Sequence, residues 1–405
     1  MGVNQGRVVL CPSCDLLVSL PPKVKGRREL CPRCAQVLRP AYEPSLSDEA
    51  ALAIAALLCL VIAVSEPFLS VESFSVREEM SLTSIISVLR FDWSALLYIF
   101  LLLTFGLPCT LLCELIAVGL FRYRPGRFFC NVYTFCHRYT MVDVFILGVL
   151  VSLVKLTSLA TVGFYEGFVA SAAFALLLLI ITLRARPARL WELLKPSQVG
   201  DVPQGVTGAS QGLKLCRHCG MVVRLSDGER CPRCGHPVVA RDFSGMQKAA
   251  ALLTAAAILY LPSNLYPIMF TEYLGVDTGS NIVEGVIALW QMDSYFVALV
   301  ILFASIFIPV LKILTLSWIL WAVKFHKVTR ALLTARVFRL VSFIGKWSMI
   351  DVFVVIIMSA VVRMSGLLVI NPGFAILAFC SVVLITMFAA ESFDERLIWD
   401  EVKAQ

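Results

Sequence analysis

Long apolar stretches alternate with polar and basic stretches along the chain from about residue 50 onward. Each apolar stretch holds roughly 20 residues, the length at which an α-helix crosses about 30 Å of hydrocarbon. We therefore predict eight transmembrane helices, in two groups of four. Their expected positions are 50–70, 94–121, 141–161, 168–183, 248–268, 295–323, 347–364 and 373–391.

Composition agrees with this pattern. The chain has 405 residues, of which 59% are hydrophobic and 16% charged, and its mean hydropathy is +0.83. Soluble domains are far less apolar. The sequence thus predicts an all-α polytopic membrane protein, and the late start of the first apolar stretch leads us to expect no cleavable signal peptide.

Basic residues gather in alternate connections. Lys and Arg are dense before the first predicted span and in 122–138, 184–247 and 324–346, whereas 162–167, 269–294 and 365–372 contain neither. Connections rich in Lys and Arg stay in the cytoplasm, so we expect both termini to be cytoplasmic. This topology and anionic headgroups account for the net charge of +7, and we expect no nucleic-acid partner.

Eight cysteines form two quartets in the polar parts of the chain. Each quartet consists of two Cys-x-x-Cys pairs, separated by 16 residues in the first and 11 in the second. Paired thiolates at this spacing are typical of tetrahedral structural zinc in a zinc ribbon, and a cytosolic location disfavours the alternative of disulfides or redox pairs. We predict two Zn²⁺ sites, formed by Cys11, Cys14, Cys31 and Cys34 and by Cys216, Cys219, Cys231 and Cys234.

The two halves of the chain resemble each other. A shift of 200 to 208 residues places Cys11 on Cys216, Pro108 on Pro309, and the run 140–145 on 348–353. Because each half has an even number of spans, we expect parallel repeats, each a zinc ribbon followed by a four-helix bundle. The expected domains are ribbon 1 (1–45), bundle 1 (46–190), a linker (191–212), ribbon 2 (213–242), bundle 2 (243–395) and a cytoplasmic tail (396–405).

Ionisable side chains inside the predicted spans mark a candidate transport site. Such groups are costly in hydrocarbon and usually face the protein interior or a wet cavity. Lys312 is the deepest, and Pro309 should kink its helix by leaving the carbonyl of Ser305 without a donor. We hypothesise that protonation of Lys312 or Asp351 drives opening and closing in the second half. The expected polar network is Lys312, Asp351, Ser305, Ser348 and Thr315.

The first half differs at the corresponding positions. Leu111 stands where the second half has Lys312, and Glu114 stands where it has Thr315. Secondary candidates are Asp143, Glu114 and Arg363. The alternative is structural, since Asp143 and Asp351 could each cap the start of a helix and Arg363 could anchor a helix end at the membrane surface.

Several further features bear on partners and chemistry. Trp191 and Trp399 are interpreted as residues of the interfacial aromatic belt. The segments 71–92 and 272–293 mix apolar and polar residues and are predicted to be helices lying on the outer surface, available to a partner or closing the bundles. The chain contains no phosphate-binding loop or nucleophile elbow, so we expect no enzyme activity.

Several runs give the chain a family resemblance. They are Gly205-Val206-Thr207-Gly208, Leu265-Tyr266-Pro267-Ile268-Met269 and Lys346-Trp347-Ser348-Met349-Ile350-Asp351-Val352-Phe353. With the tandem layout, they resemble the paraquat-inducible protein A family, to which the LetA proteins are related, over essentially the whole chain. The resemblance implies a Gram-negative inner-membrane protein that moves phospholipid together with a periplasmic MCE-domain protein (PqiB-like), and with an outer-membrane lipoprotein.

Two other functions remain compatible with the residues. The chain could anchor the periplasmic protein without carrying substrate, in which case Lys312 should tolerate substitution. Alternatively, the thiolates could act as a redox sensor, although closed four-sulfur sites are usually structural. We favour an inner-membrane subunit that passes phospholipid or a similar amphiphile to the periplasmic partner and so contributes to envelope integrity.

Overall fold

The computed structural model describes most of the chain and is mostly helical. The described residues are 7–21, 26–42, 44–73, 76–81, 94–156, 161–197, 205–273, 276–291, 293, 295–345, 349–350, 352–354, 356 and 368–400. Within them, seven helices are long and apolar enough to cross a membrane. They are Leu46–Ser65, Leu97–Gly119, Arg127–Ser152, Glu166–Arg184, Phe243–Leu265, Ala298–Lys324 and Phe374–Ser392. Most of the predicted span 347–364 lies outside the described residues.

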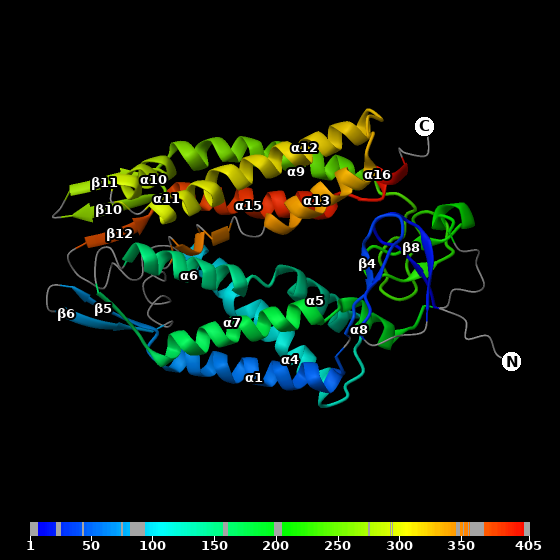
Figure 1. The fold of residues 1–405 in the computed structure, drawn as a ribbon, viewed down its shortest axis with the longest axis horizontal. Helices are drawn as coiled ribbons and strands as arrows, with labels where there is room; N and C mark the ends of the chain where they lie inside the picture. The colour runs from blue at the N-terminus through cyan, green and yellow to red at the C-terminus, as the bar shows by residue number, and fades with distance from the viewer. Residues whose placement is uncertain are drawn as a thin grey trace.

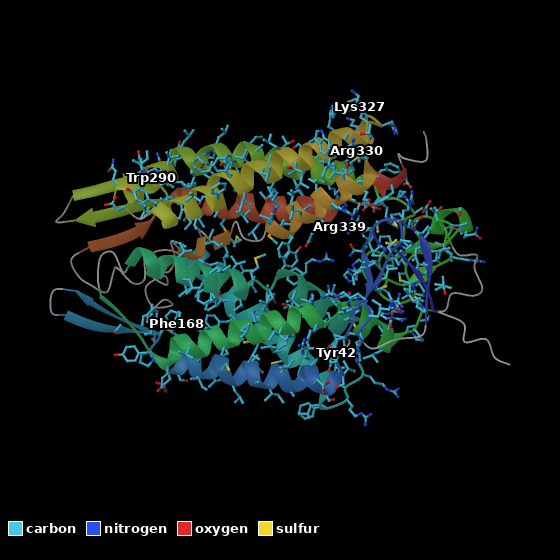
Figure 2. The ribbon with its side chains drawn as sticks, viewed as in Figure 1. Tyr42, Phe168, Trp290, Lys327, Arg330 and Arg339 are labelled. Atoms are coloured by element: carbon cyan, nitrogen blue, oxygen red, sulfur yellow. The ribbon has the colours of Figure 1, made fainter. Side chains whose placement is uncertain are left out.

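Two helical bundles lie side by side along the long axis of the molecule (Figure 1). The C-terminal helix α16 (Leu397–Asp400) and the cysteine-containing hairpins lie at one end, here called the ribbon end, and small sheets lie at the opposite end, here called the sheet end. Lys327, Arg330 and Arg339 lie toward the ribbon end, whereas Phe168 and Trp290 lie toward the sheet end (Figure 2). The three labelled basic residues thus lie on the ribbon side of the molecule.

Bundle 1 is built around α1 (Leu46–Ser65). Ser45 and Asp48 form a capping box that satisfies the first amide groups of this helix. α1 packs against α4 and α7. The other elements are α3 (Ser94–Leu101), η1 (Leu102–Gly106), α4 (Leu107–Gly119), α5 (Arg127–Tyr139), α6 (Val142–Leu156), α7 (Glu166–Arg184) and α8 (Pro187–Leu194).

Bundle 2 repeats this order of elements. Its first helix, α9 (Phe243–Leu265), packs along α15 (Phe374–Ser392). Asp242 caps α9 by accepting a hydrogen bond from the amide of Gly245. The remaining elements are α10 (Ile282–Gln291), α11 (Tyr295–Leu302), η3 (Phe303–Phe307), α12 (Ile308–Lys324), α13 (Ala331–Ile344) and α16 (Leu397–Asp400).

A three-stranded antiparallel sheet closes each bundle at the sheet end. The hairpin β5 (Leu69–Ser73) and β6 (Val76–Met80) pairs with β7 (Thr161–Phe164), and the hairpin β10 (Met269–Tyr273) and β11 (Val276–Ser280) pairs with β12 (Leu368–Pro372). The prediction of surface helices in 71–92 and 272–293 is therefore wrong for the hairpins, and α10 is the helical part. These strands were missed because a hairpin of five-residue strands has too few alternations to separate from an amphipathic helix.

At the start of the last helix of each bundle, a glycine packs closely against a backbone carbonyl. A Cβ at Gly373 would lie 2.1 Å from the carbonyl oxygen of Pro267, and a Cβ at Gly167 would lie 2.5 Å from that of Pro67. The two glycines thus bring the last helix of each bundle against the end of its first helix. The same close approach occurs in both halves.

A π-helical turn precedes the proline in the second span of each bundle. In η3 the amide of Ile308 donates to the carbonyl of Phe303, and in η1 the amide of Leu107 donates to that of Leu102. Pro309 and Pro108 follow directly and cannot donate to the carbonyl four residues back. The kink expected at Pro309 therefore takes the form of one widened turn.

The third span of bundle 1 is broken. α5 and α6 form one apolar stretch, Arg127–Ser152, but Thr140 between them is extended. The segments containing α5 and α13 were expected to be cytoplasmic connections because they carry Arg and Lys. Both segments form helices that bury an apolar face, and Arg339 of α13 is half-buried beside that face.

The two bundles meet through aromatic residues of their third spans. Phe145 and Phe353, which are sequence counterparts, lie 5.6 Å apart between ring centroids, and Phe100 packs beside both. A Cβ at Gly148 would lie 2.8 Å from Cβ of Phe353. Gly148 thus sets the close contact between the bundles.

Helices at the starts of the segments assigned to the linker and the tail pack closely. α8 crosses the expected boundary between bundle 1 and the linker, and α16 buries Leu397, Ile398 and Trp399. Trp191 is 1% exposed and Trp399 6%. Their interpretation as membrane-surface residues is therefore wrong. Both tryptophans fill the junctions between bundles and ribbons.

Candidate metal centres and membrane polar site

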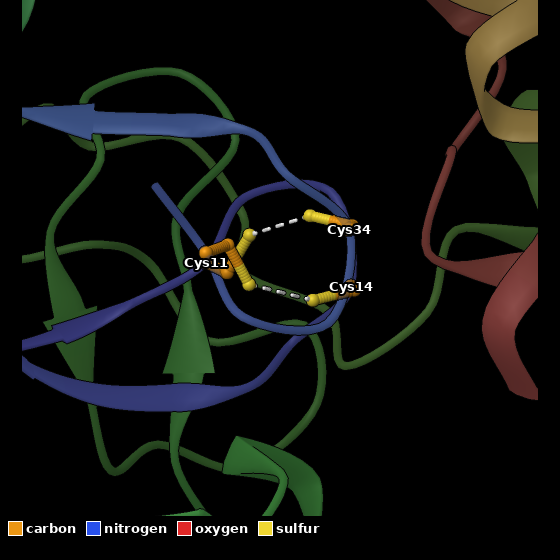
Figure 3. A group of neighbouring side chains, drawn as sticks. Cys11, Cys14 and Cys34 are labelled. Carbon is orange, nitrogen blue, oxygen red and sulfur yellow. Dashed lines mark hydrogen bonds between the residues drawn. The ribbon is translucent and has the colours of Figure 1, made fainter. Parts of the chain in front are cut away.

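The cysteine quartets are brought together as predicted. Facing sulfur atoms lie 3.5 to 3.6 Å apart in both quartets, and all four sulfurs of each group lie within 4.8 Å of one another. Tetrahedral zinc with Zn–S bonds of about 2.3 Å needs sulfurs about 3.8 Å apart. Figure 3 shows three of these cysteines converging from two hairpin turns. Each group could therefore hold a metal ion.

All four Cys-x-x-Cys turns share one backbone geometry. The amide of the residue after each second cysteine donates to the carbonyl of the first cysteine, at 2.9 to 3.0 Å. That residue is left-handed in every case: Asp15, Ala35, Gly220 and Gly235. The strands flanking the turns are β1 (Arg7–Leu10), β2 (Leu17–Leu20), β3 (Glu29–Leu30), β4 (Val37–Arg39), β8 (Lys214–Leu215) and β9 (Val222–Val223).

The first metal centre packs on bundle 2. Its four cysteines share a buried cluster with residues of α12, α13 and α16. Arg339 of α13 donates to the carbonyl of Cys34 at 3.1 Å and to the side chain of Gln36 at 2.7 Å, and it pairs with Glu395 at 3.2 Å. Ser13, inside the first cysteine turn, donates to Glu395 at 2.9 Å. Charged contacts therefore fix ribbon 1 to the second half.

The second metal centre packs on bundle 1. Its cysteines belong to the buried cluster that contains Trp191 and the inner face of α5. His218 lies 2.7 Å from the side-chain oxygen of Asn131, and Arg127 donates to the carbonyl of Pro232 at 3.2 Å. Each ribbon also touches its own bundle; Arg217, for example, donates to the carbonyl of Phe393 at 2.7 Å. Each ribbon thus contacts both bundles. The metal centres are crossed, in the sense that each one packs on the bundle of the other half of the chain.

Each bundle has a tryptophan after its last span, and each tryptophan takes part in one junction between a bundle and a ribbon. Arg33 lies over the ring of Trp399 at 4.9 Å, and His218 lies edge-on to Trp191 at 5.7 Å between ring centroids. Arg33 and its counterpart Arg233 each donate at 3.2 Å to the carbonyl of the second cysteine in their ribbon, Cys14 or Cys219. The junctions are thus built from corresponding residues.

Lys312 is buried in bundle 2, with 2% of its surface exposed. A Cβ at Gly345 would lie 2.7 Å from both Cε and Nζ of Lys312, so the lysine end rests on the backbone at the end of α13. Ser305 is fully buried and donates to the carbonyl of Ile301 at 2.7 Å, and Thr315 is half-buried. The other expected network members, Asp351 and Ser348, lie outside the described residues, as does Arg363.

The first bundle has different polar residues at the matching places. Leu111 is fully buried where bundle 2 has Lys312. Glu114 is half-buried, and its Oε2 atom has no hydrogen-bond partner among the described residues. Asp143 lies at the start of α6, although its side chain lies outside the described set. The described part of bundle 1 thus has leucine in place of the lysine, and a carboxyl group in place of the threonine, of bundle 2.

Sequence reasoning missed the residues that join the ribbons to the bundles. Arg339 and Glu395 looked like ordinary charges of a basic connection and of a chain end. The signal was present for Arg339, because it lies one helical turn after the buried Ala335 of the amphipathic α13. Gly345 was missed because a single glycine before a predicted span reads as a turn residue.

Burial controls the carboxylates outside the membrane-spanning segments. Burial raises the pKa of Glu395, while the Ser13 hydroxyl and the Arg339 guanidinium oppose that rise. Burial also acts on Asp394, but the hydrogen bonds and charge of Arg396 outweigh it and hold the pKa of Asp394 below its ordinary value. The pKa values of these adjacent carboxyl groups at the junction of ribbon 1 are therefore shifted in opposite directions.

Comparison with known proteins fits this architecture. The family model described as paraquat-inducible protein A matches residues 46–195 and 246–403, two stretches that cover the two bundles. The chain belongs to the paraquat-inducible protein A family. No solved structure matches the chain significantly.

Three relatives of this family align along nearly the whole chain. Intermembrane transport protein PqiA of Escherichia coli (strain K12) is 36% identical over 398 residues, which cover 97% of this chain and 95% of the relative. Lipophilic envelope-spanning tunnel protein A of the same organism is 28% identical over 395 residues, covering 96% and 90%. A probable intermembrane transport protein of Haemophilus influenzae is 25% identical over 405 residues, covering 97% and 96%. This chain is thus the membrane subunit of an intermembrane transport system, and these relatives are named as transport proteins.

Proposed function

We propose that the protein is the inner-membrane subunit of a Gram-negative lipid transport system and passes phospholipid between that membrane and a periplasmic MCE-domain partner. The observation that carries the proposal is the 36% identity, over 97% of the chain, to a protein named for intermembrane transport. An outer-membrane lipoprotein would complete the route across the envelope.

The proposed orientation places the ribbon end in the cytoplasm. Lys327, Arg330 and Arg339 lie toward that end, and basic residues remain on the cytoplasmic side of a membrane (Figure 2). The sheet end, which carries β5, β6, β10 and β11, then faces the periplasm and is available to the partner. In this arrangement the chain is a parallel repeat of eight spans.

Zinc is the metal proposed for both cysteine quartets. Four thiolates at the observed separation suit tetrahedral zinc, and a complete four-sulfur shell leaves no open position for catalysis. The bound ion would cross-link two hairpins that are too small to fold on their own core. The cysteine surfaces are between 0% and 7% exposed, which disfavours a redox sensor because oxidants need access to the thiolate.

The proposed transport site lies around Lys312. The amine of Lys312 lies against Gly345 at the end of α13. Residues 346–348 and Asp351 follow that end in the sequence. Interrupted helices expose backbone groups and often form the binding sites of membrane transporters. Protonation of Lys312 or Asp351 would change the charge of this site and so change which state of bundle 2 is favoured. Bundle 1 has a leucine at the matching position and would serve mainly as scaffold.

A matched pair of substitutions tests this function. Lys312→Met removes the charge with little change of length, and Leu111→Met makes a neutral change at the counterpart position. Transfer of labelled phospholipid to the periplasmic partner should be lost in the first variant and kept in the second. If Lys312→Met transfers lipid like the parent chain, the protein is an anchor for its partner rather than a transporter.

A further inference from the structure

We propose that a second lipid site lies at the ribbon end, where a cavity between the two bundles binds the headgroup of a glycerophospholipid. The cavity has a volume of about 370 Å³ and is lined by α5, α6 and α7 of bundle 1 and by Phe343 of bundle 2. Small-molecule sites usually measure roughly 300–1,000 Å³. This proposal deepens the proposed function, because it describes where lipid would enter from the membrane leaflet on the ribbon side.

A cation stands at the cavity wall. The guanidinium of Arg138 lines the cavity, and its side chain is 47% exposed. Its ion pair with Glu391 is long, at 3.6 Å, and engages one terminal nitrogen. A guanidinium carries five N–H donors and can bind two phosphate oxygens at once. Arg138 can therefore receive a phosphodiester.

Hydrogen-bond acceptors surround the rest of the polar wall. The hydroxyl of Thr140 donates to the carbonyl of Cys136 at 2.7 Å, and that of Thr182 donates to the carbonyl of Leu179 at 3.0 Å. Because each hydroxyl donates its proton to a carbonyl of the protein, it can only accept a hydrogen bond from a ligand. The cavity thus suits a headgroup that has a phosphate and also a donor, such as an ammonium or a hydroxyl group.

The apolar rim distinguishes a lipid from free phosphate. Leu179, Leu183 and Phe343 line the cavity and are 38%, 74% and 63% exposed. Leu183 lies in the last turn of α7, where that span reaches the membrane surface. A polar wall beside exposed apolar side chains at this depth matches an amphiphile whose acyl chains remain in the bilayer.

Glu391, the ionic partner of Arg138, also contacts the neighbouring Tyr139. The hydroxyl of Tyr139 donates to Glu391, and its ring packs on Phe388 at 5.6 Å between centroids. In the sequence repeat, Glu391 is the counterpart of Leu183.

The test uses the full-length protein in phosphatidylcholine vesicles that contain phosphatidylethanolamine with a photoactivatable acyl chain. Choline has no N–H or O–H donor, so the background lipid competes poorly for the proposed site. Labelled residues are located by mass spectrometry after illumination. The variant is Arg138→Gln, and the matched control is Arg184→Gln, which removes the same charge from the end of α7 outside the cavity lining. Leu179→Trp, which fills the cavity, gives a second test if Arg138→Gln folds poorly.

We expect the parent chain and Arg184→Gln to be labelled on the last turns of α7 and near Phe343. Labelling should fall roughly tenfold in Arg138→Gln, as the loss of one charge-assisted hydrogen bond predicts, and also in Leu179→Trp. Equal labelling in all four chains would show bulk lipid and overturn the proposal. Loss of labelling on addition of inorganic phosphate would also overturn it, since the cavity would then bind free phosphate.

Because the vesicles contain no periplasmic partner, the labelling experiment tests lipid binding independently of lipid transport. Absence of cavity labelling with normal lipid transfer overturns this site and leaves the proposed function in place. Cavity labelling in a chain that transfers no lipid overturns the proposed function and leaves the site.

Discussion

The two ribbon junctions use corresponding positions but different chemistry. Ribbon 1 is held to α13 by Arg339 and Glu395, whereas ribbon 2 is held to α5 by Asn131 and His218. Asn131 and Arg339 are counterparts in the repeat, and so are Ser13 and His218. The bundle that carries the buried lysine therefore binds ribbon 1 through hydrogen bonds to two residues that form an ion pair with each other. A shared fold keeps the position of each contact, while its energy can differ between the halves.

This difference makes bundle 2 the more strongly coupled half. Arg339 lies on the same helix whose end, Gly345, contacts Lys312. A rigid helix can transmit a displacement from one end to the other. Ribbon 1 is thus in a position to fix the lysine site, and bundle 1, with Leu111, has no matching arrangement in the part that the structure describes.

The largest expected effect comes from removing one metal ligand. Cys31→Ser and Cys231→Ser should each halve the metal content, because a structural zinc site contributes about 10 kcal/mol or more to the folding of its ribbon. If the metal centres are crossed, Cys31→Ser increases hydrogen exchange in α13 and α16, and Cys231→Ser increases it in α5 and α8. Metal analysis and hydrogen exchange by mass spectrometry measure both effects.

The control for this pair is Cys59→Ser, which changes a cysteine outside the quartets. It should leave the metal content unchanged. Increased exchange in α5 rather than α13 after Cys31→Ser would show that each ribbon acts on its own bundle.

Arg339→Ala should weaken the junction of ribbon 1 by about 3 kcal/mol, since it leaves the largely buried Glu395 without its ionic partner. Asn131→Ala should weaken ribbon 2 by only about 1 kcal/mol, the value of a neutral hydrogen bond. Thermal unfolding of the purified chain reports both. Arg336→Ala, on the exposed side of the same helix, is the control, and an equal loss in Arg336→Ala and Arg339→Ala would contradict the account.

The glycine contacts at the sheet end test whether the halves are packed equally tightly. Gly373→Ala should destabilise the chain by about 2 kcal/mol, because the new methyl group meets a backbone carbonyl that cannot rotate away. Gly167→Ala should cost somewhat less, since its methyl group would have more room. Gly285→Ala has no atom within 4 Å of the new Cβ and should be neutral or stabilising in thermal unfolding.

A smaller difference lies in the cysteine turns. Ala35 is left-handed with φ of 56°, whereas its counterpart Gly235 tolerates φ of 81°. Left-handed geometry costs an L-residue about 1 kcal/mol, so Ala35→Gly should stabilise ribbon 1 and Gly235→Ala should destabilise ribbon 2 by about that amount. Competition with a zinc chelator measures each change. A weaker hold on zinc after Ala35→Gly would show that strain is not the deciding factor.

The smallest expected effect is a pH dependence confined to ribbon 1. Because burial raises the pKa of Glu395 above its ordinary 4.5, the folded state binds the proton more tightly than the unfolded state. That stabilisation is complete below pH 4.5 and is lost as the pH rises through the folded-state pKa. Glu395→Gln should flatten this fall in melting temperature, and the exposed Glu66→Gln should not. The junction of ribbon 2 has Pro187 of α8 at the corresponding position and should lack the effect.

Much of this architecture could be predicted from local patterns. Hydropathy predicted the spans, cysteine spacing predicted both quartets, and the shift between halves predicted that Phe145 and Phe353 occupy equivalent places. The strands of the sheet end were missed because they are short. The crossed packing was missed because contacts such as Ser13 to Glu395 join residues 382 positions apart, and no local pattern records them. The burial of Trp191 was missed for the same reason.

The candidate transport site was only partly accessible from sequence. Lys312 could be identified from the sequence because it is an isolated lysine in an apolar span, where an ionisable residue is costly and usually has a function. The contact between Lys312 and Gly345 requires α13 to pack beside α12. The α13 segment had been interpreted from the sequence as a basic connection.

The most direct test of the central claim compares lipid contact in the two bundles. A photoreactive side chain is placed at Thr315 or at its counterpart Glu114, both half-buried, and cells containing labelled phospholipid are illuminated. The account predicts labelling at position 315 that decreases when Lys312→Met is added, with little labelling at position 114. Equal labelling of both positions, indifferent to Lys312, would contradict a transport site in the second bundle.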